Sequence, residues 1–142
     1  MLQLISAGEE ATRVSAARVL GVALKFNPDA AFQSILETQI LAEPGNVGAD
    51  VVHGRCLALG QVLRYNAERC AASHAAIIDR IRVYLKSDSL MVRKAAISDC
   101  KYVLNAYALL SEADKVEIAE EGSERVDARA GRPAERSLAV HL

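Results

Sequence analysis

The chain has 142 residues, about one domain, of which 51% are hydrophobic and 25% are charged, a balance that excludes wholesale disorder. The formal net charge of −1 argues against a dedicated nucleic-acid binder, and no apolar run reaches the roughly 18 residues of a membrane span, so neither partner is expected. Only 4% of the residues are aromatic and Pro and Gly are few, which favours helices over a β-sandwich.

The first predicted helix covers residues 9–26, with apolar side chains at helical spacing on one face. Asn27 is predicted to cap a second helix, with Pro28 at its first position, where a missing N–H costs nothing. This second helix is expected to end near Ala42. The faces expected to be buried are Val14, Ala17, Leu20 and Leu24 in the first helix, and Phe32, Ile35, Leu36 and Ile40 in the second.

Three further helices follow the loop at residues 43–48. Asp50 is the predicted cap of the third helix, which ends in a polar turn near Asn66, and the fourth helix ends at Lys86. Residues 87–89 are predicted to form a turn and the cap of the fifth. The expected core stripes are Val52, Cys56, Leu59 and Leu63; then Ile77, Ile78, Ile81, Tyr84 and Leu85; then Val92, Ala96, Cys100, Val103 and Tyr107.

The C-terminal part of the chain changes character. Residues 111–114 have the spacing of a capping box, which predicts a short sixth helix that ends at Gly122. From residue 123 onward charges alternate in sign and apolar periodicity is lost, so we expect a disordered tail, with a basic binding peptide as the alternative. The predicted organisation is a helical domain over residues 1–121 and a charged tail over residues 122–142.

The helices repeat one another with a period near 40 residues. Residues 13–21 align with residues 52–60 at an offset of 39, and Val51 aligns with Val92 at an offset of 41. Two helices in a period of this length are typical of HEAT or armadillo repeats. The expected fold class is therefore all-α, an α-solenoid of stacked antiparallel helix pairs, and a plain helical bundle is the alternative.

The phase of the repeat leaves unpaired helices at both ends. The first helix corresponds to the second helix of a repeat, and the last to the first helix of another. Solenoid ends need polar caps, whereas these two helices carry many apolar side chains. We interpret the chain as a piece of a longer solenoid, a truncated product, or a protein that hides its ends against a partner, and we expect self-association or fraying there. The apolar residues are Leu2, Val14, Val19 and Val22 at one end, and Leu110, Val116 and Ile118 at the other.

Three phrases carry a family resemblance that covers residues 9–121. Residues 92–96 (Val-Arg-Lys-Ala-Ala) and residues 13–21 resemble the Val-Arg-x-x-Ala core of HEAT second helices. Residues 53–60 (His-Gly-Arg-Cys-Leu-Ala-Leu-Gly) are similar to a variant found in very large HEAT scaffolds, the nearest being the proteasome adaptor and scaffold family. This resemblance implies proteasome subunits as partners. Tubulin-folding cofactor D and a large translational activator family use similar phrases, and Val52 and Arg55 depart from the pattern.

One set of residues has the spacing of metal ligands: His53-x2-Cys56 and Cys70-x3-His74. Because His53 and Cys56 lie within an apolar helical pattern, we favour core packing over zinc and predict no metal or cofactor. The cysteines Cys56, Cys70 and Cys100 cannot all pair, which indicates a reducing compartment, the cytoplasm and also the nucleus.

The sequence contains no motif of an enzyme, so we expect none of its residues to be catalytic. Asp79 and Asp99 are interpreted as solvated carboxylates paired with neighbouring cations. The function expected is a protein-binding scaffold, with the proteasome as first partner. A helical enzyme or regulatory subunit with a hidden site, and an RNA-associated repeat, are the alternatives. The cations that could form a basic stripe for RNA are Arg13, Arg18, Arg55, Arg64 and Arg69.

Overall fold

The computed structural model describes residues 2–109, 112, 115–116 and 119–120, and the predicted tail over residues 122–142 lies outside them, as does most of the predicted sixth helix. The regular structure within the described part is entirely helical. The α-helices are α1 (Glu10–Ala23), α2 (Asp29–Ile35), α3 (Ala49–Tyr65), α4 (His74–Leu85) and α5 (Leu90–Ala108). Single turns of 3₁₀ helix span Leu4–Ser6, Leu24–Phe26 and Glu68–Ser73, and a π-helical turn spans Leu36–Ile40.

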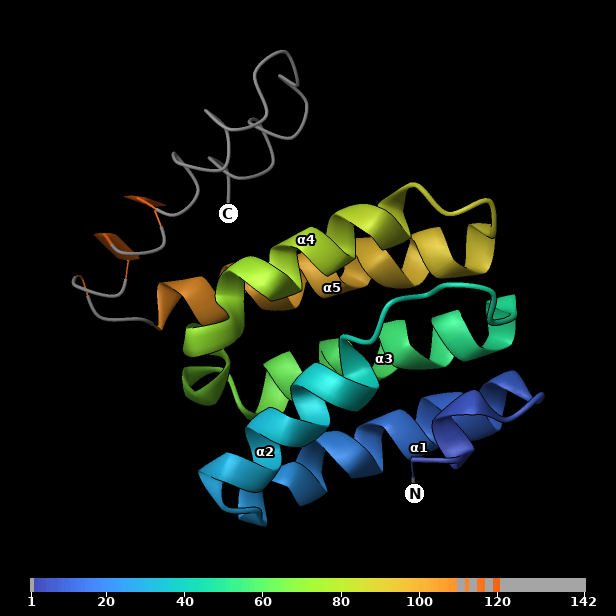
Figure 1. Ribbon diagram of the computed structural model, residues 1–142, viewed down its shortest axis with the longest axis horizontal. Coiled ribbons are helices and arrows are strands. Elements are labelled where there is room, and N and C mark those ends of the chain that lie inside the picture. The colour runs from blue at the N-terminus through green and yellow to red at the C-terminus, as the bar shows by residue number, and fades with distance from the viewer. Residues whose placement is uncertain (1, 110–111, 113–114, 117–118, 121–142) are drawn as a thin grey trace.

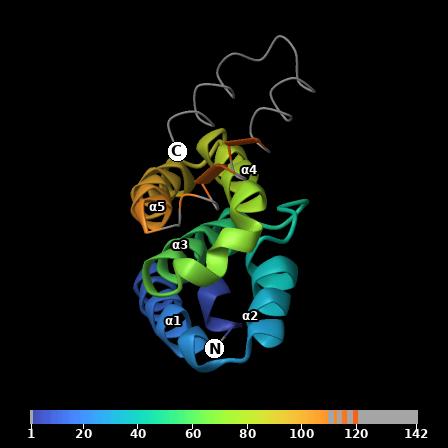
Figure 2. The same ribbon diagram turned by 90° about the vertical axis from the view of Figure 1, so that its left-hand side faces the viewer.

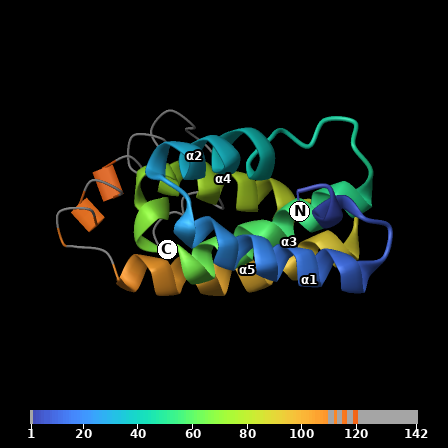
Figure 3. The same cartoon turned by 90° about the horizontal axis from the view of Figure 1, so that it is seen from below.

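The helices form two layers (Figures 1 and 3). The long-helix layer consists of α1, α3 and α5, which lie side by side so that α3 contacts both of the others. The short-helix layer consists of α2 and α4, which pack over the first layer on one side. No helix in the described part is both long and apolar enough to cross a membrane.

The three helices of the long-helix layer start at equivalent positions of a repeat. Their N-terminal flanking residues are Glu9, Gly48 and Ser89, which are 39 and 41 residues apart. These are the two offsets found in the sequence, so the repeat is real in three dimensions as well. The fold is an α-solenoid of HEAT type, as predicted.

Glycines let the helices of the long-helix layer approach closely. A Cβ atom on Gly21 of α1 would lie 2.7 Å from the backbone oxygen of Gln61 on α3, and one on Gly60 of α3 would collide with Asp99 on α5. The two glycines are equivalent in the repeat, so the same device is used at both helix contacts. Between the layers the core is apolar, with Leu20, Leu24, Phe32, Leu36, Leu59, Leu63, Ile77, Ile81 and Val92 almost fully buried.

The turn Leu4–Ser6 closes the N-terminal end of the core (Figure 2). It packs on α1 and α3, and Ile5 is buried, with 3% of its surface exposed. The carbonyl of Ile5 lies directly over Gly54 of α3, where any Cβ atom would collide with it. Gly54 is therefore required for this turn to dock.

Three details of the sequence prediction are wrong. Pro28, not Asn27, precedes α2 directly, and no side chain caps that helix. Gly48 flanks α3, which places Asp50 in the first turn, where its charge still favours the helix N-terminus. Val14 is 39% exposed because it lies on the solvent side of α1, outside the core stripe. The Ser89 cap is confirmed: its hydroxyl accepts a hydrogen bond from the Val92 backbone N–H.

Candidate protein-binding faces

Arg13 is a buried cation that joins all three helices of the long-helix layer. Its side chain is 2% exposed. The Nε–H donates to Nδ1 of His53 on α3 across 3.1 Å, and Nη2 donates to the Met91 sulfur on α5 across 3.3 Å. The guanidinium therefore holds α1 against both α3 and α5.

The remaining donors of Arg13 fix the N-terminal segment. Its Nη1 donates to the carbonyls of Ala7 and Gly8, 2.8 and 2.9 Å away, and forms an ion pair with Asp50 at 3.4 Å. A buried guanidinium is stable only when its donors are satisfied. Arg13 meets that condition, so its role is structural.

His53 is neutral in this arrangement. Because Nδ1 accepts from Arg13, the ring proton lies on Nε2. Burial lowers the pKa of His53, and the charge of Arg13 lowers it further, while Glu10 and Asp50 oppose the effect. A neutral imidazole whose Nδ1 lone pair is already used by Arg13 is held as a packing residue.

The four residues with metal-ligand spacing have separate surroundings. His53 binds Arg13, and Cys56 donates to Asp99 on α5. Cys70 is buried in the turn Glu68–Ser73, where burial raises the pKa of its thiol to about 12. His74 stacks near Tyr107 of α5 with 6.2 Å between the ring centroids. Among the described residues no three His, Cys, Asp or Glu side chains are close enough to hold a metal ion.

Asp99 is the largest departure from the sequence interpretation. It is only 2% exposed, not solvated, and its Oδ2 accepts a hydrogen bond from the Cys56 thiol across 3.2 Å. Burial raises the pKa of Asp99 well above its usual range. The carboxyl faces α3 because Gly60 leaves space there, and sequence spacing alone carries no signal of that space. Asp79, in contrast, forms the predicted ion pair with Arg82 at 3.4 Å.

The five arginines considered for an RNA stripe do not act together. Arg13 is buried, and Arg69 donates to the carbonyls of Leu24 and Asn27, which fixes the turn after α1. Arg55 is half-buried, so only Arg18 and Arg64 are exposed. The predicted stripe is therefore wrong as a set of five.

The side of α5 that faces away from α3 carries an apolar stripe. Leu90, Ile97 and Leu104 are 56%, 63% and 47% exposed, and their spacing of seven residues places them on one side of the helix. Lys94 and Lys101 are exposed within the same stripe. We call these five residues the α5 end face. It was missed in the sequence, although the seven-residue spacing was visible there.

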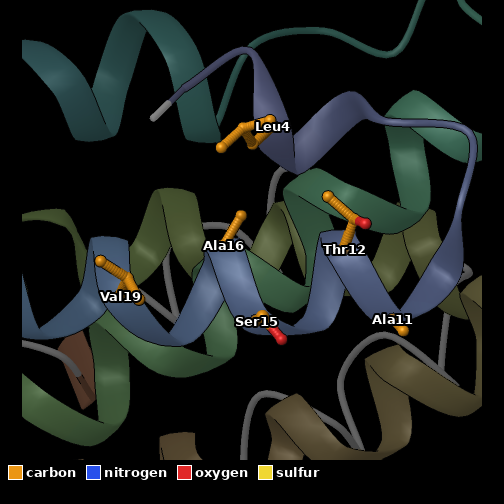
Figure 4. Close-up of a pocket in the computed structure, with 6 residues that line it drawn as sticks. All are labelled: Leu4, Ala11, Thr12, Ser15, Ala16 and Val19. Carbon is orange, nitrogen blue, oxygen red and sulfur yellow. The ribbon is translucent and has the colours of Figure 1, made fainter.

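At the other end of the solenoid, α1 and the N-terminal turn expose a second apolar surface, the α1 end face. It consists of Leu4, Val19, Val22 and Phe26, which are 50%, 47%, 38% and 83% exposed. The predicted exposure of Val14, Val19 and Val22 is confirmed, whereas Leu2 packs against the core. Figure 4 shows a shallow depression here, in which Leu4 lies over α1. Its lining residues are Leu4, Ala11, Thr12, Ser15, Ala16 and Val19.

Two apolar end faces on a stack of helix pairs define a HEAT-type repeat solenoid. A family model described as "Stalled ribosome sensor GCN1-like, HEAT repeats" matches residues 1–122, and the chain belongs to this family. The resemblance to the proteasome adaptor and scaffold family is not confirmed. No curated protein and no solved structure matches the chain.

Proposed function

We propose that the chain is a non-catalytic, protein-binding solenoid segment that takes part in recognising stalled ribosomes. The family match over residues 1–122 carries this proposal, because the family description names a sensor of stalled ribosomes. The translational activator resemblance noted in the sequence agrees with it. Ribosomes place the site of action in the cytoplasm.

The charge on the solvent side of the long-helix layer supports a ribosomal partner. Arg18 on α1 and Arg64 on α3 are exposed on neighbouring helices, and Lys25 follows α1 closely. Ribosomal RNA is a polyanion, and exposed guanidinium groups are suited to its phosphates. Because these cations are few, we expect binding that weakens strongly with salt.

Sedimentation with purified ribosomes tests the proposal. The purified chain is expected to sediment with ribosomes at low salt, and the double variant Arg18→Glu/Arg64→Glu is expected to remain in the supernatant. Glu37→Lys is the matched control, because Glu37 is exposed on the π-helical turn of the short-helix layer. Equal binding of all three proteins would remove the assigned face, and no binding of the unaltered chain would remove the ribosomal proposal.

The same chain should be tested against purified 26S proteasomes. Binding to proteasomes but not to ribosomes would favour the adaptor function that the sequence phrase at residues 53–60 suggested. Binding to ribosomes alone would support the proposal made here.

A further inference from the structure

The two end faces are related by the internal repeat. On α3, Cys56 and Gly60 contact α5: the Cys56 thiol donates to Asp99, and Gly60 lies against Asp99 and Tyr102. The repeat offset of 41 residues places Ile97 and Lys101 of α5 at the positions of Cys56 and Gly60. The α5 end face is therefore the surface with which each preceding helix of this layer binds the following one.

The α1 end face has the opposite role in the repeat. On α3, Gln61 receives Gly21 of α1. The offset of 39 residues places Val22 of α1 at the position of Gln61. The α1 end face is thus the surface with which a helix of this layer binds the preceding one, so the two end faces are complementary by the same packing that joins α1 to α3 and α3 to α5.

We propose that the α5 end face of one copy binds the α1 end face of a second copy, so that the chain associates head to tail. The contact continues the packing already present inside each copy, with Ile97 in the place of Cys56. Both faces are apolar and exposed, and such surfaces mark interfaces. Because each copy keeps one free face, the association is heterologous and forms an open chain of copies.

Charges at the contact agree with this partner. His53 and Met91 contact the same Arg13 guanidinium, so these two positions are neighbours across the contact of α3 with α5. Lys94 has the repeat position of His53, and Ala11 has that of Met91. Lys94 would therefore lie beside the start of α1 of the next copy, where the adjacent Glu10 is exposed.

The test uses two single variants of the full chain, Ile97→Asp and Val19→Asp, in sedimentation equilibrium over a range of concentrations. The unaltered chain should increase in average mass with concentration beyond that of a dimer. Each variant alone should be monomeric. An equimolar mixture should form a one-to-one dimer and nothing larger, because each variant keeps one intact face.

Both substitutions are at exposed positions, and circular dichroism checks that each variant is folded. Ser98→Asp is the matched control, because Ser98 is exposed next to Ile97 but lies off the stripe; it should associate like the unaltered chain. Lys94→Glu should weaken association, and Glu10→Lys in addition should restore it. A strictly monomeric unaltered chain overturns the proposal. So does a mixture of the two variants that stays monomeric, or a dimer formed by either variant alone.

Discussion

The carboxyl group of Asp99 on α5 lies against Gly60 on α3, in a space that a side chain at residue 60 would fill. The same carboxyl accepts the thiol proton of Cys56, one helical turn earlier on α3. Near it, the Tyr84 hydroxyl of α4 is buried without a hydrogen-bond partner among the described residues. A carboxyl in such a place is stable mainly in its neutral form.

Gly60→Ala should destabilise the fold by about 1–3 kcal/mol, because the new methyl group displaces the buried Asp99 side chain. Urea unfolding measures the effect. Gly8→Ala is the control, because a Cβ atom at Gly8 meets nothing within 4 Å. Equal midpoints for the two variants would mean that α3 and α5 are farther apart than described.

Asp99→Asn should raise the free energy of unfolding near pH 7 relative to the unaltered chain. The pKa of Asp99 is higher in the folded than in the unfolded state, so the carboxyl contributes stability only at low pH. This stability is lost as the pH rises from the ordinary value of 3.8 towards the raised pKa. The advantage of Asn over Asp should therefore grow with pH, as measured by urea unfolding between about pH 4 and pH 7.

The difference between the two proteins isolates Asp99 from the histidines, which act in the opposite direction. Burial lowers the pKa of His53 and of His74, so they reduce stability as the pH falls below their ordinary value of 6.5. Asp88→Asn, at an exposed turn position, should show no such trend. A constant difference between Asp99→Asn and the unaltered chain would contradict a buried neutral carboxyl.

Arg13→Ala should destabilise the chain by ~3 kcal/mol or more, because it leaves the carbonyls of Ala7 and Gly8 and the ring of His53 without their donor. Thermal unfolding gives the magnitude. Arg18→Ala, at an exposed position on the same helix, should change stability by less than about 0.5 kcal/mol.

A double-mutant cycle separates the contact with His53 from the rest. His53→Ala alone leaves the Arg13 Nε–H without its acceptor, so the two substitutions should cost less together than the sum of each alone. Strict additivity would show that the 3.1 Å contact does not contribute to stability.

Leu59→Asp should be severely destabilising, by about 4 kcal/mol or more, because Leu59 is fully buried between the layers and a carboxylate there has no partner. Ile97→Asp introduces the same group at a position that is 63% exposed. Circular dichroism melting should show a large fall in the midpoint for the first variant and a small change for the second. Similar melting of both would make the core stripe of α3 wrong.

Periodicity was enough to predict the architecture. Apolar spacing gave the five helices, and the offsets near 40 residues gave their stacking, because a repeated helix pair has only one way to bury its apolar side against the next pair. Boundaries were less accurate where two residues could both flank a helix, as with Gly48 and Asp50. There the first-turn charge resembles a cap in the sequence, and only backbone geometry separates them.

The polar interior was not predictable in the same way. Arg13 and Asp99 are charged residue types that sequence reasoning places in solvent, and both are buried. What buries them lies elsewhere in the chain: the carbonyls of residues 7 and 8 for Arg13, and the missing side chain of Gly60 for Asp99. These partners are distant in sequence or lack any side chain, so no local pattern reports them.

The reach of Arg13 bears on how the molecule unfolds. In an ideal linear array each unit interacts only with its immediate neighbours, so the ends can melt while the middle remains folded. Arg13 starts on α1, passes His53 on α3 and ends at Met91 on α5, so it couples the first and third helices of the layer directly. Loss of either outer helix would break a contact of the other. The three repeats should therefore melt as one cooperative unit, with one transition observed by every spectroscopic probe.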